Sequence, residues 1–501
     1  MNSSGLEKLK ENYWLHFALL LAVVFLLCGK PVPYSNEYVY LLRLIKPFHA
    51  DFLLNDFIYS KPANEHWLFD HIFGFFTLFV RVEVIAWIGR IACWTLLLAG
   101  LLRLGKLWKI PLWLVSGSVF LWLCLGQSMV ADEWMIGVFE AKGPAYICLL
   151  FALDGFAREQ LFYPSALLGL SFSLHPAVGL WAIPAAVLAV ALVRFDLVKL
   201  IKIAAIGGLF SLPGLIPLFS SQITNDQNTT ENWKYFELVI FPYHFDPFSW
   251  ARSSLVLMIL IGVFCLMFYL KNKADERQKF LTAFLLILFL FFISGLFLRA
   301  LGQYELLRFM PMRLYSVIGP LFFLFALAAA YRQKVFAPPV TPLSALGLIC
   351  LLGWTSPLAT GFFNLQNTVK EWRTPRDDAA ETFIWIRENT PNGTVVLAPP
   401  WRRDFWYLSR RAQVVSFVHT PVADLNEWRA RLRELVGRHP PEEGEIEKKD
   451  MADFYNQLTT DEILESTRKY GADYFISQTV YPFPIAFQSG KFKVYRMTPE
   501  G

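Results

Sequence analysis

Charged residues are scarce in this chain of 501 residues: they make up 17% of it, whereas 55% of the residues are hydrophobic. The mean hydropathy is +0.40, far above the value of a soluble globular protein. This composition indicates an integral membrane protein. The formal net charge of +5 is small for the length, and no tail rich in Lys and Arg is present. Nucleic-acid binding is therefore set aside.

Cysteine is rare as well. All six cysteines lie in or at the ends of apolar segments, and none lies in the polar C-terminal part, which argues against a disulfide framework and a thiolate zinc site. The sequence also lacks a P-loop, a glycine-rich dinucleotide motif, the zinc-protease motif HExxH and the hydrolase motif GxSxG. ATP-driven transport and the common hydrolase mechanisms therefore lose support.

Long apolar segments dominate what is present. Segments of roughly 17 to 25 apolar residues can cross a bilayer, and the sequence contains eleven candidates, of which the fourth and fifth are short. They are residues 13–29, 84–104, 110–126, 144–157, 163–174, 177–193, 201–219, 253–270, 280–298, 314–331 and 342–360. No signal-peptidase cleavage pattern follows the first, so we expect it to be an uncleaved span. Segment 67–80 ends in charged residues and is expected to be a helix lying in the membrane interface.

The charge of the connections predicts the orientation. Short connections rich in Lys and Arg all lie on one side of this arrangement: 103–109, 194–202, 271–279 and 332–334. With Lys8 and Lys10 they place the N-terminus in the cytoplasm. The acidic first loop and everything after residue 360 then lie on the outer face. If segment 67–80 crossed the membrane, the basic connection at 103–109 would face outward, which is why we place that segment in the interface.

The composition becomes mixed and charged from residue 374 onward. We therefore expect a mainly α, polytopic transmembrane bundle of about 11 spans over 1–362, with its first outer loop at 30–83, and a soluble extracytoplasmic α/β domain over 363–501. Alternating strand and helix patterns predict a largely parallel sheet. The expected strands are 393–398, 413–418, 472–477 and 492–496. The expected helices are 377–388, 425–436 and 461–470, the last with a capping box of Thr459 and Glu462.

Acidic residues gather in the polar stretch 31–70. Glu37 follows closely on the first span, near the outer membrane face, where a carboxylate can take a proton from an attacking hydroxyl. Asp51 is the second acidic candidate, and on an ideal helix it does not share a face with Asp56. Solvation in an exposed loop explains the remaining acids more readily: Asp56, which is kept as a secondary candidate, Glu65 and Asp70.

Basic residues on the outer side could hold a phosphate. Lys142 lies two residues from Glu140 at the mouth of the fourth span, where a charge is costly and therefore usually paired or functional. Phosphate binding by Lys142 and its pairing with a loop carboxylate are both open. Further candidates for phosphate binding are His244, Arg308 and Arg313. The guanidinium group of an arginine can donate two parallel hydrogen bonds to phosphate oxygens. His175 is a secondary candidate, because a lone histidine is more often structural. For at least one of the outer arginines, a side chain that extends to the membrane interface is a sufficient explanation.

The layout resembles the GT-C superfamily of membrane glycosyltransferases, and within it an uncharacterised bacterial branch. The resemblance covers essentially the whole chain and rests on short motifs. These are Asn36-Glu37, His49-Ala-Asp51-Phe, Phe139-Glu140-Ala-Lys142, Leu174-His175-Pro176, and the pair Trp385-Ile-Arg-Glu-Asn-Thr-Pro391 and Pro399-Pro400. The sequence departs from the pattern at Asn36, where many members have a second acidic residue.

This resemblance implies transfer of a sugar from a polyprenyl-phosphate donor to a glycan, lipid or protein acceptor, at the periplasmic face of a bacterial inner membrane. It implies that Glu37 is the catalytic base and that Asp51 orients the acceptor or holds a divalent cation. The departing phosphate would be stabilised by Lys142, His244 and Arg308. Two alternatives stay open: a transporter or flippase of a lipid-linked or amphipathic solute, and a non-catalytic envelope protein.

Overall fold

The computed structural model describes residues 11–60, 65–222, 230–271, 275–336, 357–417, 424–437 and 448–497. Within these ranges the chain is mostly helical, with one small sheet. It divides into two compact units. Unit 1 contains Met1–Pro31, Trp87–Leu215 and Tyr243–Trp372, and unit 2 contains Val32–Ala86, Ile216–Pro242 and Arg373–Gly501. The predicted first outer loop thus belongs to the same unit as the C-terminal segment, and a domain boundary at 362/363 stays a prediction.

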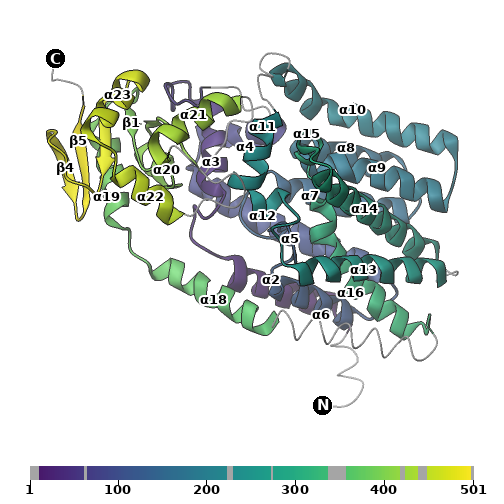
Figure 1. The fold of residues 1–501 in the computed structure, drawn as a ribbon. Helices are drawn as coiled ribbons and strands as arrows, with labels where there is room; N and C mark the ends of the chain where they lie inside the picture. Colours follow the sequence, from purple (N-terminus) through teal and green to yellow (C-terminus); the bar gives the residue numbers. More distant parts are fainter. Residues whose placement is uncertain are drawn as a thin grey trace, which may run out of the picture. The chain divides into compact units, whose positions relative to one another are not determined.

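Apolar helices build unit 1 (Figure 1). Among the described residues, six helices are long and apolar enough to cross a membrane: α5 (Val82–Leu107), α9 (Pro176–Val193), α10 (Leu197–Gln222), α13 (Arg252–Lys271), α14 (Glu276–Ala300) and α16 (Arg313–Arg332). Four shorter ones are α2 (Tyr13–Cys28), α6 (Leu112–Cys124), α7 (Lys142–Ala157) and α8 (Phe162–Leu174). Helices therefore cover ten of the eleven predicted segments. The eleventh, 342–360, lies mostly outside the described residues, and the count of eleven spans stays a prediction.

Local signals place the ends of these helices. The Asn12 side chain accepts a hydrogen bond from Leu15 N at 3.2 Å and so caps α2. A single residue, His175, separates α8 from α9, because Pro176 has no amide hydrogen to continue α8 and instead begins α9. The bundle core lies around α16, which is 83% buried over its apolar window, whereas α10 is 22% buried and therefore peripheral.

The N-terminal part of unit 2 contains α3 (Glu37–Ile45), α4 (Trp67–Gly74) and η2 (Phe75–Leu78). The predicted interfacial segment 67–80 is thus helical over most of its length. One side of it, with Phe69 and Asp70, is buried, while large apolar side chains such as Phe79, 69% exposed, lie on the surface. This amphipathic arrangement suits a helix in a membrane interface. Its location there stays a prediction.

The C-terminal part of unit 2 contains a five-stranded sheet in the order β2-β1-β3-β5-β4. The strands are β1 (Val395–Leu397), β2 (Ala412–Gln413), β3 (Tyr474–Ser477), β4 (Ile485–Ser489) and β5 (Phe492–Arg496). β2, β1 and β3 run parallel, whereas β5 pairs antiparallel with both β3 and β4. The sheet is therefore mixed rather than largely parallel. β4, which the sequence pattern does not predict, is joined to β5 by a tight turn in which Gly490 adopts φ 51°.

Helices accompany this sheet. The predicted helices are present as α19 (Asp378–Asn389), α21 (Leu425–Val436) and α23 (Thr460–Tyr470), and the short α20 (Phe405–Ser409) and α22 (Lys448–Asn456) are additional. α19 packs against β4 and β5 (Figure 1). The predicted capping box is confirmed, because Glu462 N donates to Thr459 Oγ1 at 3.3 Å and Thr459 N donates to Glu462 Oε2 at 2.9 Å.

Candidate functional site

A buried carboxylate, Glu133, lies at the centre of a charged cluster in unit 1. Glu133 is 1% exposed and belongs to the connection between α6 and α7. Arg313, the first residue of α16, brings its Nε to 2.8 Å from Glu133 Oε1, and its Nη2 donates to Glu133 Oε2 at 3.2 Å. A two-point contact of this kind fixes the orientation of both groups. The sequence motifs do not single out Glu133.

Lys142, the first residue of α7, reaches the same carboxylate. Its Nζ lies 3.0 Å from Glu140 Oε1 and 3.6 Å from Glu133 Oε2. The ammonium also lies 3.5 Å from the centre of the Trp134 ring, a favourable cation–π distance. Of the two possibilities left open for Lys142, pairing with loop carboxylates is the one present in this structure.

His244 adds a third basic group, from the short helix α12 (Pro242–Phe245). Its Nδ1 donates to the Ala131 carbonyl at 2.7 Å, which requires the proton on Nδ1, and the same atom lies 4.0 Å from Glu133 Oε1. The Glu133 cluster is defined here as Glu133, Glu140, Lys142, His244 and Arg313.

The charges of the Glu133 cluster nearly balance. Burial alone would raise the pKa of Glu133, but the neighbouring positive charges, chiefly those of Arg313 and Lys142, hold it below its ordinary value, so this carboxylate is ionised at neutral pH. Burial lowers the pKa of His244, against the attraction of Glu133, so the imidazole is neutral at pH 7. Two carboxylates then face one ammonium and one guanidinium, and this pairing makes the burial of four charges tolerable.

Two helix N-termini meet at the cluster. α7 begins at Lys142 and α16 at Arg313, and neither N-cap residue makes a side-chain capping hydrogen bond. The first turn of a helix presents amide hydrogens and the positive end of the helix dipole, and both favour an anion. The cluster therefore combines basic side chains with two helix ends suited to negative charge.

The structure thus brings together four predicted outer residues: Glu140, Lys142, His244 and Arg313. Arg308 is half-buried, with its guanidinium 5.1 Å from the centre of the Phe309 ring. His175 is buried between α8 and α9, and its backbone N–H donates to Ser171 O at 3.0 Å.

The acidic candidates of the first loop lie in unit 2. Glu37 is fully buried at the first turn of α3, where its Oε2 accepts a hydrogen bond from Tyr34 N at 3.0 Å. Asp51 is exposed in a turn. Because residues 51–60 form turns rather than a helix, the argument from ideal helical spacing does not apply there. Asn55, in the same turns, donates to Gly393 O at 2.7 Å.

Asp56 is not solvated, contrary to the sequence interpretation, but fully buried. Its Oδ1 accepts hydrogen bonds from Ile58 N at 2.9 Å and Tyr59 N at 3.0 Å. Its Oδ2 accepts from Gln413 N at 2.9 Å and Trp406 Nε1 at 2.7 Å. Four donors satisfy the carboxylate, so Asp56 has a structural part in joining the loop to the C-terminal segment.

Asp70 is buried as well, again contrary to expectation, whereas Glu65 is 43% exposed. Arg43 Nε lies 3.7 Å from Asp70 Oδ2. Within the described parts of the chain, neither Arg43 Nε nor Asp70 Oδ1 has a hydrogen-bond partner. Burial raises the pKa of Asp70 to about 7, although Arg43 opposes this shift. A carboxyl group with a pKa near neutrality can gain or lose a proton under working conditions.

The C-terminal sheet offers little room for a ligand. Its strand order reverses between β1 and β3, where α/β sheets tend to bind ligands, but the Tyr455 hydroxyl lies there, 3.0 Å from Leu397 O and 2.9 Å from Ile476 O. The nearby Arg402 is paired with Asp377 and Asp404, each at 2.6 Å. Both observations favour a structural role for the residues around the position between β1 and β3.

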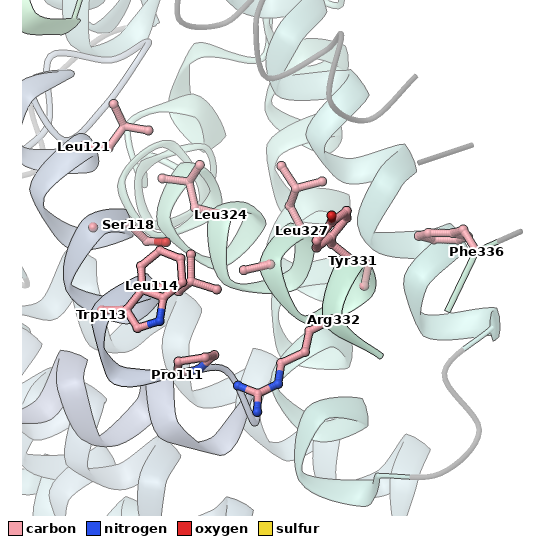
Figure 2. Close-up of a pocket in the computed structure, with 13 residues that line it drawn as sticks. Pro111, Trp113, Leu114, Ser118, Leu121, Leu324, Leu327, Tyr331, Arg332 and Phe336 are labelled. Atoms are coloured by element: carbon pink, nitrogen blue, oxygen red, sulfur yellow. The ribbon is translucent and has the colours of Figure 1, made fainter. Parts of the chain in front are cut away.

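No group of three or more His, Cys, Asp and Glu side chains suited to a metal ion occurs among the described residues. Asp51 therefore has no set of companion ligands there. A cavity of about 610 Å³ lies between α6 and α16 in unit 1. Figure 2 shows its walls, which include Trp113, Leu114, Leu324, Leu327 and Tyr331. Among the described residues that line it, Arg332 is the charged one. This groove suits a hydrocarbon chain, not acid–base chemistry.

Part of this chain matches a protein family, and most of it aligns with a solved structure. Residues 377–435 match a family model described as a domain of unknown function, DUF6798. No curated protein matches the chain. A solved structure that aligns with it is the arabinofuranosyltransferase AftD from mycobacteria, with 13% sequence identity, a TM-score of 0.46 and coverage of 97% of this chain and 41% of that chain. The chain thus spans less than half the length of AftD, and a likeness at this level assigns no activity.

Proposed function

We propose that this chain is a membrane glycosyltransferase that moves a sugar from a polyprenyl-phosphate donor to an acceptor at the outer face of the membrane. The observation that supports the proposal is the Glu133 cluster, in which three basic side chains, two of them from the first residues of α7 and α16, gather around one buried carboxylate within an apolar bundle. This combination suits a lipid-linked phosphate, whose chain lies in the bilayer while its charged group needs basic partners. The motif resemblance of the sequence points the same way.

The reaction assigns a task to each group. An acceptor hydroxyl oxygen attacks the anomeric carbon of the sugar, and its proton passes to a carboxylate, for which Glu37 is proposed. The bond from the anomeric carbon to the phosphate oxygen breaks, and its electron pair leaves with the polyprenyl phosphate. Lys142, His244 and Arg313 stabilise the negative charge that develops there. Asp51, exposed in its turn, is proposed to orient the acceptor.

The balance of charges sets a condition on donor binding. Glu133 and Glu140 already offset Lys142 and Arg313, so an added phosphate brings a surplus negative charge into a buried site. A proton taken up by His244 offsets that charge, because an adjacent anion favours the protonated imidazole. Arg308 does not belong to the Glu133 cluster, and we propose it as a more peripheral contact of the donor phosphate.

Donor turnover tests the proposal without knowledge of the acceptor. The full chain in proteoliposomes is supplied with polyprenyl phosphates that carry different radiolabelled sugars, and free polyprenyl phosphate and released or transferred sugar are measured. We expect turnover of at least one donor, and a loss of roughly 10²-fold or more in Arg313→Ala, which removes a transition-state contact. Arg299→Ala is the matched control, since Arg299 pairs with Asp246 at 2.9 Å instead.

Two outcomes contradict the proposal. Counterflow of a labelled solute across the proteoliposome membrane, with every donor left intact, favours a transporter. A lipid phosphate located at the cytoplasmic end of the bundle contradicts the placement of the reaction at the outer face.

A further inference from the structure

Tyr146 carries a buried hydroxyl group for which the described residues provide no hydrogen-bond partner. It lies on α7, one turn after Lys142, so both side chains are on the same face of the helix. Tyr146 is fully buried, and no donor or acceptor within the described ranges bonds to its hydroxyl. A buried polar group without a hydrogen bond costs free energy. Such groups are rare and call for an explanation.

The charges of the Glu133 cluster act on this hydroxyl. Tyr146 interacts electrostatically with Glu133, Arg313 and Glu140. Tyr146 thus lies near the start of α7, on the helix face of Lys142, and within electrostatic reach of Arg313. A neutral hydroxyl there can donate to an anion without adding a charge that must be balanced, which suits a site where the protein charges already balance.

We propose that the Tyr146 hydroxyl is a ligand-contacting group, which donates a hydrogen bond to a non-bridging oxygen of a phosphate held in the Glu133 cluster. The identity of that phosphate as the head group of a polyprenyl lipid rests on the proposed function. The Tyr146 contact itself rests on the burial and the missing partner of its hydroxyl.

Tyr315 provides a matched control in the same unit. It is equally buried, but its hydroxyl donates to Met258 O at 2.9 Å. Tyr315→Phe therefore breaks an existing hydrogen bond, whereas Tyr146→Phe removes a group for which the described residues show no hydrogen bond to lose. We expect Tyr315→Phe to lower the unfolding temperature of the ligand-free protein and Tyr146→Phe to leave it unchanged or raise it.

Binding measurements on the full chain in detergent test the contact. The probes are polyprenyl phosphate, inorganic phosphate and polyprenol, which lacks the phosphate. We expect Tyr146→Phe to raise the Kd for polyprenyl phosphate about 10-fold, the effect of one hydrogen bond to a charged group. Its Kd for polyprenol should equal that of the wild type, and Tyr315→Phe should bind all three probes as the wild type does.

The outcomes separate this inference from the proposed function. If Tyr146→Phe weakens phosphate binding while no sugar donor is turned over, the contact holds and the glycosyltransferase fails. If donors are turned over and Tyr146→Phe binds polyprenyl phosphate as tightly as the wild type, the contact is wrong and the function holds. Absence of any phosphate binding by the wild type overturns the contact.

Discussion

The Asp56 carboxylate accepts a hydrogen bond from the Trp406 indole at 2.7 Å, across 350 residues of sequence. The backbone N–H of Gln413 donates to the same oxygen. Both donors belong to the C-terminal segment, whereas Asp56 belongs to the first loop. The two stretches are therefore joined within one compact unit by a buried carboxylate that accepts hydrogen bonds from both.

Removal of this carboxylate should destabilise unit 2. Asp56→Ala leaves Trp406 Nε1 and Gln413 N buried without an acceptor, and we expect a loss of about 3–5 kcal/mol in the free energy of unfolding. Asp51→Ala, in the same turns but exposed, should change it by less than about 0.5 kcal/mol. Thermal unfolding of the purified chain and limited proteolysis of the C-terminal segment measure the difference. Equal stability of the two variants would contradict this account.

The Glu133–Arg313 pair should behave as a buried ion pair in a double-mutant cycle. Glu133→Ala leaves Arg313 without its two-point partner, and we expect a loss of about 3–5 kcal/mol. Arg313→Ala should cost a similar amount, because it leaves Glu133 short of its nearest cation. The double variant should lose clearly less than the sum of the two, since it leaves neither charge unpaired. Strictly additive losses in thermal unfolding would show that the two side chains do not depend on each other.

The elements of this fold are well predicted by local pattern. β5 and α21 have the bounds that the sequence predicts, because alternation and the 3.6-residue period depend on neighbours alone. β4 escapes prediction because its pairing depends on β5. The mixed sheet is a consequence of the same pairing.

Burial of single acids depends on distant residues, and there local pattern fails. Asp56, Glu65 and Asp70 look alike in the sequence. Asp56 is nevertheless buried, and two of its hydrogen-bond donors, Trp406 and Gln413, lie far away in the sequence. Glu133 is missed for the same reason, since Arg313, its main partner, lies 180 residues away. One signal was present: a loop with Asp132, Glu133 and Glu140 but few bases of its own must find cations elsewhere.

The Asp70 carboxyl group should make stability depend on pH near neutrality. Its pKa in the folded chain is about 7, raised by burial from an ordinary value of 3.8. The folded state therefore holds more protons than the unfolded state between these values, and its stability falls as pH rises through this window and levels off above pH 7. Unfolding temperatures from pH 4.5 to 8 should decline more steeply for the wild type than for Asp70→Asn, which has no proton to release. Parallel curves would rule out this role of Asp70.

The assignment of the base is tested best by a variant that keeps the fold. Glu37 is buried, and its carboxylate accepts a hydrogen bond from the Tyr34 N–H, which the side-chain oxygen of a glutamine of the same size can also accept. Glu37→Gln should therefore unfold within a few degrees of the wild type while losing the ability to take a proton. We expect its sugar transfer to fall about 10²–10⁴-fold, the usual contribution of a general base. Asp51→Asn, exposed and proposed only to orient the acceptor, should reduce transfer less. Wild-type turnover by Glu37→Gln, with the fold intact, would assign the proton transfer to another carboxylate, and Asp70, whose pKa lies near neutrality, would be the first to test.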